Sequence, residues 1–363
     1  MKDTLGKKGR IYVVHTFYHV YVSMLKEFAL PKEQQGNASI VLSRMSNDFG
    51  NIGERLLKTG VFKEYFDYDE KKDIEFPELV DLKTDRGNIV SNMIQRIKYT
   101  KKLAKLESEF VPVNFKEYDE IYVFCDSDPI GIYLNQNKIR YHAVEDGLDY
   151  LAGYNLAIYN NRGHFKIKKF FSMNLNLIFI CDGYSKYCID MEINDVSKVK
   201  YPFEKYKEVR RSELEERLTS EEKKLLIEAF VKDLDRIRRE IGETKGTKDN
   251  ILILTEPLTP SLETRERIFR DLIAEYEKEG TIFLKPHPRD ELDYPSVFPD
   301  ILQFEGKVPM EILNFFEELH FKKVVSVFTE LGSIRFADEK VKLGRYFMDK
   351  YEDPEIHNQN EKI

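Results

Sequence analysis

The chain has 363 residues, a length that suggests about two domains. Its formal net charge is −7 and 42% of its residues are hydrophobic, which excludes a mainly disordered chain and argues against a protein that coats nucleic acid. Three cysteines without a Cys-x-x-Cys pair predict reduced thiols, and no apolar run reaches the roughly 20 residues that span a bilayer. We therefore expect a cytoplasmic protein with no nucleic-acid partner.

Short apolar runs alternate with helical patterns in the first half of the chain. Strands are predicted at 11–14, 39–42, 63–68, 120–125 and 138–144, and helices at 21–30, 52–59, 89–110 and 130–136. This alternation favours parallel strands in a doubly wound sheet. Ligands of such sheets bind beyond the carboxyl ends of the strands, so the residues after each strand are candidates for function.

The pattern changes near residue 201. A charged helical stretch at 213–242 leads into a polar break at 242–250, which is the best linker in the chain. Beyond it, strands are predicted at 251–255, 281–285 and 323–328, and helices at 263–279, at 310–318 and from about 329. The sequence therefore predicts an α/β fold of two Rossmann-like domains, 1–245 and 250–363, with a helical linker near 213–250 and an active site in the cleft between the domains.

His287 lies on a proline-rich loop directly after a predicted strand. Pro286 and Pro288 restrict the backbone on both sides, and Lys285 and Arg289 add two positive charges. A histidine among cations at the end of a strand suits an anionic ligand such as phosphate. A surface histidine in a proline turn is the alternative.

An acidic pair follows the strand predicted at 138–144. Glu145 and Asp146 precede Gly147. Adjacent carboxylates at a strand end repel one another, which can raise one pKa and supply a general base. An ordinary acidic turn closed by glycine is the alternative.

Hydroxyl side chains surround the last predicted strand-to-helix junction. Ser326, Thr329 and Ser333 lie there, and a helix N-terminus with hydroxyls is an anion site. Capping of that helix by Thr329 is the alternative, and both can hold together. Thr255 and Glu256 begin a proline-containing loop after the strand at 251–255, where a plain connecting loop is equally consistent.

Asp126 and Asp128 form an Asp-x-Asp pair after the strand at 120–125. That spacing holds a divalent metal in one large class of sugar transferases. Because Pro129 follows, a helix cap from Ser127 or Asp128 explains the pair without a metal, and we prefer that interpretation.

The remaining features are less specific. His15 and His19 flank the first strand-to-helix turn, where Thr16 or His19 could contact a ligand, although either histidine is equally consistent with core packing. The basic segments 98–105 and 166–171 indicate solvated faces, with weak attraction to an anionic membrane as the alternative. No motif of P-loop NTPases, dinucleotide oxidoreductases, zinc proteases or α/β-hydrolases is present.

Taken in order, the motifs resemble those of bacterial sialyltransferases, most closely glycosyltransferase family 52, which includes lipooligosaccharide α-2,3-sialyltransferases. These enzymes share a GT-B-type fold and three short motifs. Their acidic-acidic-Gly, His-Pro and Ser/Thr motifs are matched by Glu145-Asp146-Gly147, by His287-Pro288, and by Ser326 with Thr329. Two residues separate the hydroxyls of the third motif, which departs from the adjacent pair of the family.

The resemblance implies inverting transfer of sialic acid from CMP-sialic acid to a galactoside-type hydroxyl of a surface glycan, lipooligosaccharide or capsule, with no cofactor and no obligatory metal. Domain 1–245 would serve the acceptor and domain 250–363 would bind CMP. The implied partners are CMP-sialic acid and a glycan or glycolipid acceptor. Peripheral contact with the inner face of the cell membrane and a homodimer are further expectations.

The resemblance also implies roles for individual residues. His287, helped by Lys285 and Arg289, would protonate or neutralise the leaving phosphate, which Ser326 and Thr329 would hold. Glu145, slightly preferred, or Asp146 would take the acceptor proton, with Glu256 as an alternative base. The other binding candidates are Thr16, Gly147, Thr255, Pro288 and Glu330.

Two alternatives remain from the sequence. One is another GT-B glycosyltransferase that uses a UDP- or GDP-sugar. The other is a non-catalytic nucleotide- or glycan-binding protein with the same fold. Neither the acceptor nor the linkage follows from the residues.

Overall fold

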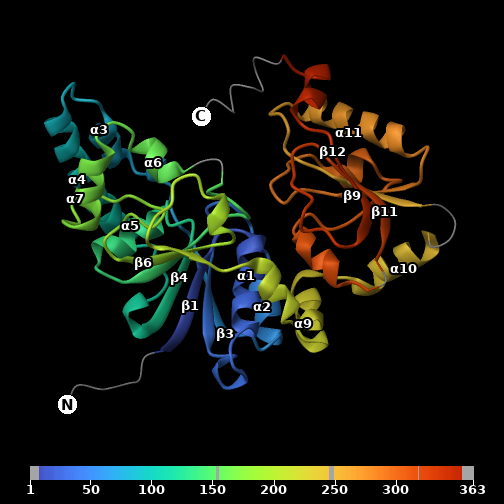
Figure 1. The fold of residues 1–363 in the computed structure, drawn as a ribbon, viewed down its shortest axis with the longest axis horizontal. Coiled ribbons are helices and arrows are strands. Elements are labelled where there is room, and N and C mark those ends of the chain that lie inside the picture. Colours follow the sequence, from blue (N-terminus) through green and yellow to red (C-terminus); the bar gives the residue numbers. More distant parts are fainter. Residues whose placement is uncertain (1–7, 153–154, 245–248, 318, 354–363) are drawn as a thin grey trace. The chain divides into compact units, whose positions relative to one another are not determined.

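The computed structural model describes residues 8–152, 155–244, 249–317 and 319–353. Contacts divide the chain into two compact units, Met1–Glu222 and Lys223–Ile363, each with its own parallel sheet (Figure 1). The sequence placed the boundary at 245–250, of which 245–248 lie outside the described residues. The division falls earlier because most of helix α9 (Ser220–Phe230) and all of α10 (Leu234–Thr244) group with the second unit.

The first unit is built on a seven-stranded sheet with the order β3-β2-β1-β4-β5-β6-β7. Every neighbouring pair is parallel. The strands are β1 Lys8–Val14, β2 Ala38–Ser43, β3 Phe62–Tyr68, β4 Tyr118–Phe124, β5 Tyr141–Val144, β6 Cys188–Ile193 and β7 Tyr206–Glu208. The strand order reverses between β1 and β4, and a doubly wound sheet binds ligands beyond the carboxyl ends of its strands at that switch point.

Helices connect these strands. They are α1 Phe17–Phe28, α2 Ile52–Lys58, α3 Val80–Lys83, α4 Ile89–Glu107, α5 Pro129–Gln136, α6 Leu156–Asn160, α7 Phe165–Met173 and α8 Arg211–Glu216. Helix α1 begins four residues before the predicted start because Thr16 Oγ1 accepts the His19 N–H and caps it. Short 3₁₀ helices lie at Lys32–Gln34, Asp73–Glu75, Pro77–Leu79, Phe115–Glu117 and Val196–Lys198.

Two apolar clusters stabilise the first unit. One packs on the central strands and includes Ile11, Val123 and Ala143. The other includes Leu103 of α4 and Ile132 of α5. Burial of one such aliphatic side chain contributes about 1.5–3 kcal/mol, so these clusters fix the strands whose ends carry the polar residues described below.

The second unit contains a five-stranded parallel sheet with the order β10-β9-β8-β11-β12. Its strands are β8 Asn250–Leu254, β9 Thr281–Lys285, β10 Leu302–Gln303, β11 Phe321–Ser326 and β12 Ala337–Lys342, and its further helices are α11 Leu262–Tyr276 and α12 Tyr294–Val297. The three predicted strands of this unit are confirmed. Among the described residues, no helix of either unit is long and apolar enough to cross a bilayer.

Two predicted helices of the second unit differ from the structure. The helix expected at 310–318 is the 3₁₀ helix Met310–Phe315, and residue 318 lies outside the described residues. A further 3₁₀ helix spans Arg345–Lys350. The helix expected from Thr329 is wrong, because bends and a turn lead from β11 to β12 there. The Glu256 side chain, described with the candidate site, binds the main chain of this turn.

Candidate active site

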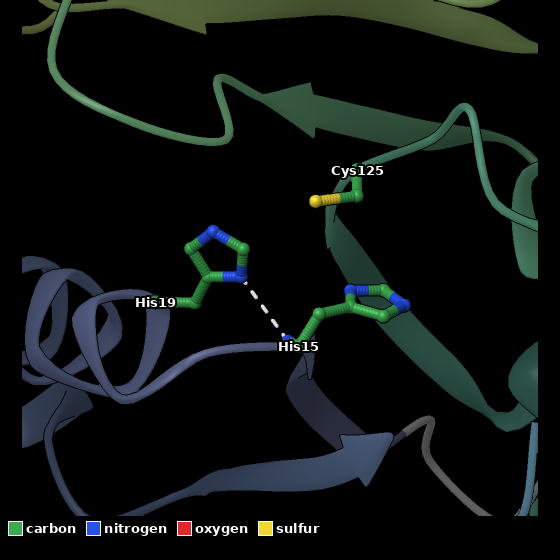
Figure 2. A group of neighbouring side chains, drawn as sticks. All are labelled: His15, His19 and Cys125. Atoms are coloured by element: carbon green, nitrogen blue, oxygen red, sulfur yellow. Dashed lines mark hydrogen bonds between the residues drawn. The ribbon is translucent and has the colours of Figure 1, made fainter. Parts of the chain in front are cut away.

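Polar side chains of the first unit gather at the switch point of its sheet. His15 directly follows β1, His19 lies in the first turn of α1, and Cys125 follows β4 (Figure 2). Asp146, which follows β5, is in hydrogen-bond contact with His19 and Cys125. The carboxyl ends of three neighbouring strands therefore place these groups together.

Asp146 is the accessible carboxylate of this group, with 39% of its side chain exposed. Its Oδ1 lies 3.0 Å from His19 Nε2 and accepts a hydrogen bond of 3.0 Å from the Cys125 thiol. Its main-chain oxygen lies 2.7 Å from the same His19 nitrogen. The carboxylate is therefore held in one orientation while solvent still reaches it.

The protonation of the neighbours follows from their contacts. His19 Nδ1 accepts the main-chain N–H of His15 at 3.1 Å, as Figure 2 shows, so the ring proton lies on Nε2 and is donated to Asp146. Burial lowers the pKa of His19 and raises the pKa of the Cys125 thiol. Both side chains are thus neutral hydrogen-bond donors. Cys125 also has a left-handed backbone, φ +54°, an uncommon conformation for a residue with a Cβ.

Glu145, in contrast, is buried, with 1% exposure. Its Oε1 accepts the N–H of Asn194 at 2.5 Å and lies 3.7 Å from Nη2 of Arg211. Burial raises its pKa to about 7. Glu145 therefore links β5 to the segments after β6 and β7, and it offers no surface to a substrate. At Gly147 an added Cβ would meet nothing within 4 Å, so packing does not require the glycine.

The Asp-x-Asp pair after β4 has two separate roles. Asp126 is buried and accepts hydrogen bonds of 3.0 Å from the Tyr141 hydroxyl and from the Asp182 N–H. Asp128 occupies the N-cap position of α5 without a side-chain cap bond, and its Oδ2 lies 3.5 Å from His15 Nε2. Burial raises the pKa of Asp126 to about 6 and that of Asp128 to about 7.

Glu70, rather than the Asp-x-Asp pair, accepts the first N–H of α5. Its Oε1 accepts the Ile130 N–H at 2.8 Å, and its Oε2 contacts His15 Nε2 at 2.8 Å. Burial opposes charge on His15, but Glu70 outweighs it, so the pKa of His15 is raised. The helix cap that the sequence assigned to Ser127 or Asp128 is thus supplied by a carboxylate that follows β3.

Two groups of described side chains have ligand atoms close enough for a metal ion, within 4.8 Å of one another. They are His15, His19 and Cys125, and Asp126, Cys181 and Asp182. In the first group both nitrogens of His19 and the thiol are engaged in hydrogen bonds, whereas His15 Nδ1 is buried without a partner. A cation would have to displace the thiol proton and the Asp146 contacts, so this group better suits positioning of the carboxylate.

In the second unit, His287 follows β9 and lies beside the end of β8. Its main-chain N–H donates to Thr255 Oγ1 at 3.1 Å. Its Nδ1 accepts the Arg289 N–H at 3.1 Å, so the neutral ring carries its proton on Nε2. Burial, together with the charges of Arg289 and Lys285, lowers the pKa of His287 to about 4. The ring is therefore a neutral donor through Nε2.

Main-chain oxygens hold the Lys285 side chain. Its ammonium is buried and donates to the carbonyls of Pro286 and Gly306, both at 2.9 Å. Burial lowers its pKa to about 7. Lys285 thus fixes the loop at 286–289, called the proline loop below, to the chain after β10. Pro288 and Arg289 of this loop are exposed.

A buried ion pair holds the other end of this loop. Arg265 of α11 pairs with Asp290 and also donates to the carbonyl of Thr259. Asp290 accepts further hydrogen bonds from the Tyr294 hydroxyl at 2.8 Å and the Leu292 N–H at 3.1 Å. The loops after β8 and β9 are therefore tied to α11, which fixes the position of His287.

Glu256 binds the main chain directly after β11, in the segment where a helix was expected from Thr329. Its buried carboxylate accepts the N–H groups of Val327 at 3.0 Å, Phe328 at 2.9 Å and Thr329 at 3.0 Å. The main-chain donors that the sequence assigned to a phosphate are thus satisfied by a carboxylate of the chain itself. Ser326 is also buried, and its hydroxyl donates to the carbonyl of Thr329 at 2.8 Å. Glu330, the last binding candidate, is exposed and pairs with Lys342.

A cavity of 590 Å³ borders the proline loop. Pro286, Tyr294, Phe304, Glu305, Gly306 and Arg236 are among its lining residues. Its volume is within the usual range for small-molecule sites.

Sequence reasoning left the function of His19 open and missed Asn194 and Arg211. The spacing of His15 and His19 in the first strand-to-helix turn was the available signal for His19. The other two residues follow β6 and β7, which were not predicted because Cys188–Ile193 contains two acidic residues and β7 has only three residues. Without these strands, no pattern connected either residue with Glu145.

Two parallel α/β sheets, with polar residues at the carboxyl ends of their strands, define a glycosyltransferase fold of the GT-B type. The chain belongs to glycosyltransferase family 52, whose sequence profile matches residues 72–337. The α/β-galactoside α-2,3-sialyltransferase of Photobacterium phosphoreum shares the fold, with a TM-score of 0.52 and 14% identity over 92% of this chain and 90% of that chain.

Two other proteins resemble this chain, one in structure over most of its length and one in sequence over about a third of it. A sialyltransferase of Photobacterium damsela matches with a TM-score of 0.49 and 11% identity, over 93% of this chain and 74% of that one. An uncharacterized protein of Haemophilus influenzae is 29% identical over 127 residues, which is 34% of this chain. The match spans 39% of the length of that curated relative.

Proposed function

We propose that this protein is an inverting sialyltransferase that moves sialic acid from CMP-sialic acid to a galactoside-type hydroxyl of a surface glycan, without an obligatory metal. Membership of family 52 supports glycosyl transfer. Two kinds of group, one in each unit, carry the proposal. An accessible, oriented carboxylate follows β5, and a neutral imidazole with its proton on Nε2 follows β9.

Asp146 is the proposed general base. It would take the proton of the acceptor hydroxyl as that oxygen bonds to the anomeric carbon of sialic acid. The bond from that carbon to the phosphate breaks on the opposite face, so the configuration inverts. Exposure favours Asp146 over Glu145, which is buried behind it, and over Glu256, whose oxygens hold three main-chain N–H groups.

His287 is the proposed donor to the leaving phosphate. Its Nε2 proton would bond to a phosphate oxygen of CMP, whose negative charge raises the imidazole pKa from its low value in the free protein. A phosphate monoester leaves with less negative charge than a nucleoside diphosphate, so a proton donor and the exposed Arg289 can replace a divalent cation. We assign the cytidine to the 590 Å³ cavity beside the same loop.

The test is incubation with CMP-sialic acid and a panel of galactosides, analysed by mass spectrometry. UDP- and GDP-sugars serve as matched donors, and each reaction is run with and without EDTA. We expect a sialylated product in both conditions. Transfer from a UDP- or GDP-sugar alone, CMP binding with no transfer or hydrolysis, or full loss on chelation with rescue by Mn²⁺ would each contradict the proposal.

A further inference from the structure

Two helices of the first unit share an exposed apolar surface. Helix α4 exposes Ile89, Val90 and Ile94, at 63%, 69% and 48%, and helix α7 exposes Ile167 and Phe170, at 54% and 51%. We call these five side chains the α4–α7 surface. Figure 1 labels the two helices next to one another in the first unit. Contiguous exposed apolar side chains on a globular protein mark an interaction site more often than single ones do.

The α4–α7 surface is hollowed and firmly supported. A groove of 730 Å³ is lined by residues of both helices, including Ile89, Ile94 and Ile167. On the inner side, Met93 of α4 and Phe171 of α7 pack against the same apolar cluster. The core therefore anchors both helices through other side chains, and the exposed ones are not required for its packing.

The same helices are strongly basic. Helix α4 carries five Lys or Arg residues and α7 carries three, whereas the only acidic residue within the two helices is Glu107. Glu107 is buried and accepts a hydrogen bond from Tyr68. Eight positive charges against one negative charge contrast with the net charge of −7 for the whole chain.

Apolar and basic residues share one face of α4. Val90, Ile94, Lys98, Lys101 and Lys105 follow one another at spacings of four, four, three and four, which places them in one stripe along the helix. All five are exposed. The stripe is apolar at its N-terminal end and basic at its C-terminal end. On α7, the exposed Lys166 is adjacent to Ile167.

We propose that the α4–α7 surface docks on an anionic lipid membrane, with its aliphatic and aromatic side chains entering the interface and the lysines contacting the headgroups. This combination of residues is typical of helices that lie on membranes. A soluble polyanion would leave the apolar side chains unexplained. A second copy of the chain docked through the same surface would bring like charges together. The inference does not depend on the chemistry proposed above.

The test is sedimentation of the full chain with sucrose-loaded vesicles of phosphatidylcholine, with and without phosphatidylglycerol. Each basic residue near an anionic bilayer is worth about a fivefold change in partitioning. We expect binding only to the anionic vesicles, and weaker binding at high salt. The triple substitution Lys98→Glu, Lys101→Glu and Lys105→Glu should weaken this binding by about 100-fold or more.

A matched triple substitution controls for net charge. Lys58→Glu, Lys116→Glu and Lys200→Glu change exposed lysines outside α4 and α7 by the same total charge and should weaken binding far less. Ile94→Gln with Ile167→Gln keeps every lysine but should weaken binding about tenfold, because two side chains no longer enter the interface. Thermal denaturation confirms that each variant folds.

Three results would overturn the inference: equal binding to neutral and anionic vesicles, no binding to either, or equal losses in the two lysine triples. A dimer in light scattering that Ile94→Gln with Ile167→Gln dissociates would assign the surface to a second copy instead. Turnover of a soluble galactoside should be unchanged in all these variants. The vesicles contain no substrate, so failure of docking and failure of sialyl transfer are distinguishable.

Discussion

The imidazole of His19 contacts Asp146 at two oxygens through one nitrogen, with Nε2 2.7 Å from the main-chain oxygen and 3.0 Å from Oδ1. The other ring nitrogen is held by the main chain of His15. Because His19 is fully buried and stacks on Phe124 at 4.5 Å between ring centroids, it has little freedom to turn. Asp146 is thus oriented by a rigid part of the fold.

Replacement of Asp146 by Asn should lower the transfer rate by about 10²- to 10⁴-fold, the usual contribution of a positioned general base. Glu145→Gln is the matched control, and the properly folded variant should keep most of its activity. Initial rates with CMP-sialic acid and a galactoside give the comparison. If Glu145→Gln loses more activity than Asp146→Asn, Glu145 is the base and the proposal for Asp146 is wrong.

His19→Phe should lower turnover while leaving the apparent affinity for CMP nearly unchanged. Phenylalanine keeps the stacking on Phe124 but removes the donor to Asp146. We expect a loss of about tenfold, since the orientation of the carboxylate is weakened and the carboxylate itself remains. A double-mutant cycle with Asp146→Asn checks the mechanism: the losses should not add if His19 acts through Asp146.

His287→Ala should lower transfer by about 10²-fold or more, because the proton donor to the leaving phosphate is lost. CMP binding, measured by calorimetry, should change much less than turnover. Thr255→Val tests the support of this ring, since it removes the oxygen that accepts the His287 N–H. We expect it to be less damaging than His287→Ala. Unchanged turnover in His287→Ala would exclude the donor role.

Glu256→Gln separates a structural carboxylate from a catalytic one. An amide group would turn an N–H toward the three main-chain donors after β11, so the unfolding free energy should fall by about 1–3 kcal/mol. Activity below the melting temperature should largely remain. Denaturant unfolding and initial rates are measured on the same preparation. A fully stable but inactive variant would identify Glu256 as the base.

Glu145 should make stability depend on pH. Burial raises its folded-state pKa to about 7, above the value of 4.5 for a free carboxyl. The folded chain therefore binds the extra proton between these values, and this group's contribution to stability falls as the pH rises through that window. Glu145→Gln cannot lose a proton. Between about pH 5 and pH 8 the unfolding free energy of the Glu145→Gln variant should fall less than that of the native chain. The difference between the two decreases should be about 2 kcal/mol.

The sequence predicted the strands that position the site from short apolar runs that alternate with helical patterns, and the run of β9 is continuous. Strand β9 was predicted at its observed bounds, and the ends of β5 and β9 correctly placed Asp146 and His287 after strands. Continuous apolar runs are the pattern of parallel strands buried on both faces. The fold class follows from that pattern and from the alternation with helices.

The features that the sequence did not predict depend on contacts between distant residues. The stretch after β11 has the hydroxyls of a helix start but forms bends and a turn. Its N–H groups are bound by Glu256, about 70 residues earlier in the chain. The burial of Glu145 likewise depends on Asn194 and Arg211, which contact its carboxylate, and the proposed preference for Asp146 as the base rests on that burial. No local pattern contains such information.

The thiol of Cys125 is a chemical reporter for the site. All three cysteines lie in described parts of the chain. Cys125 is half-buried, whereas Cys181 and Cys188 are buried. Because it donates to Asp146 and its pKa is raised, alkylating reagents that need a thiolate should react slowly with it. An acceptor analogue that engages Asp146 should therefore change the alkylation rate of a single thiol, which gives a binding assay that needs no turnover.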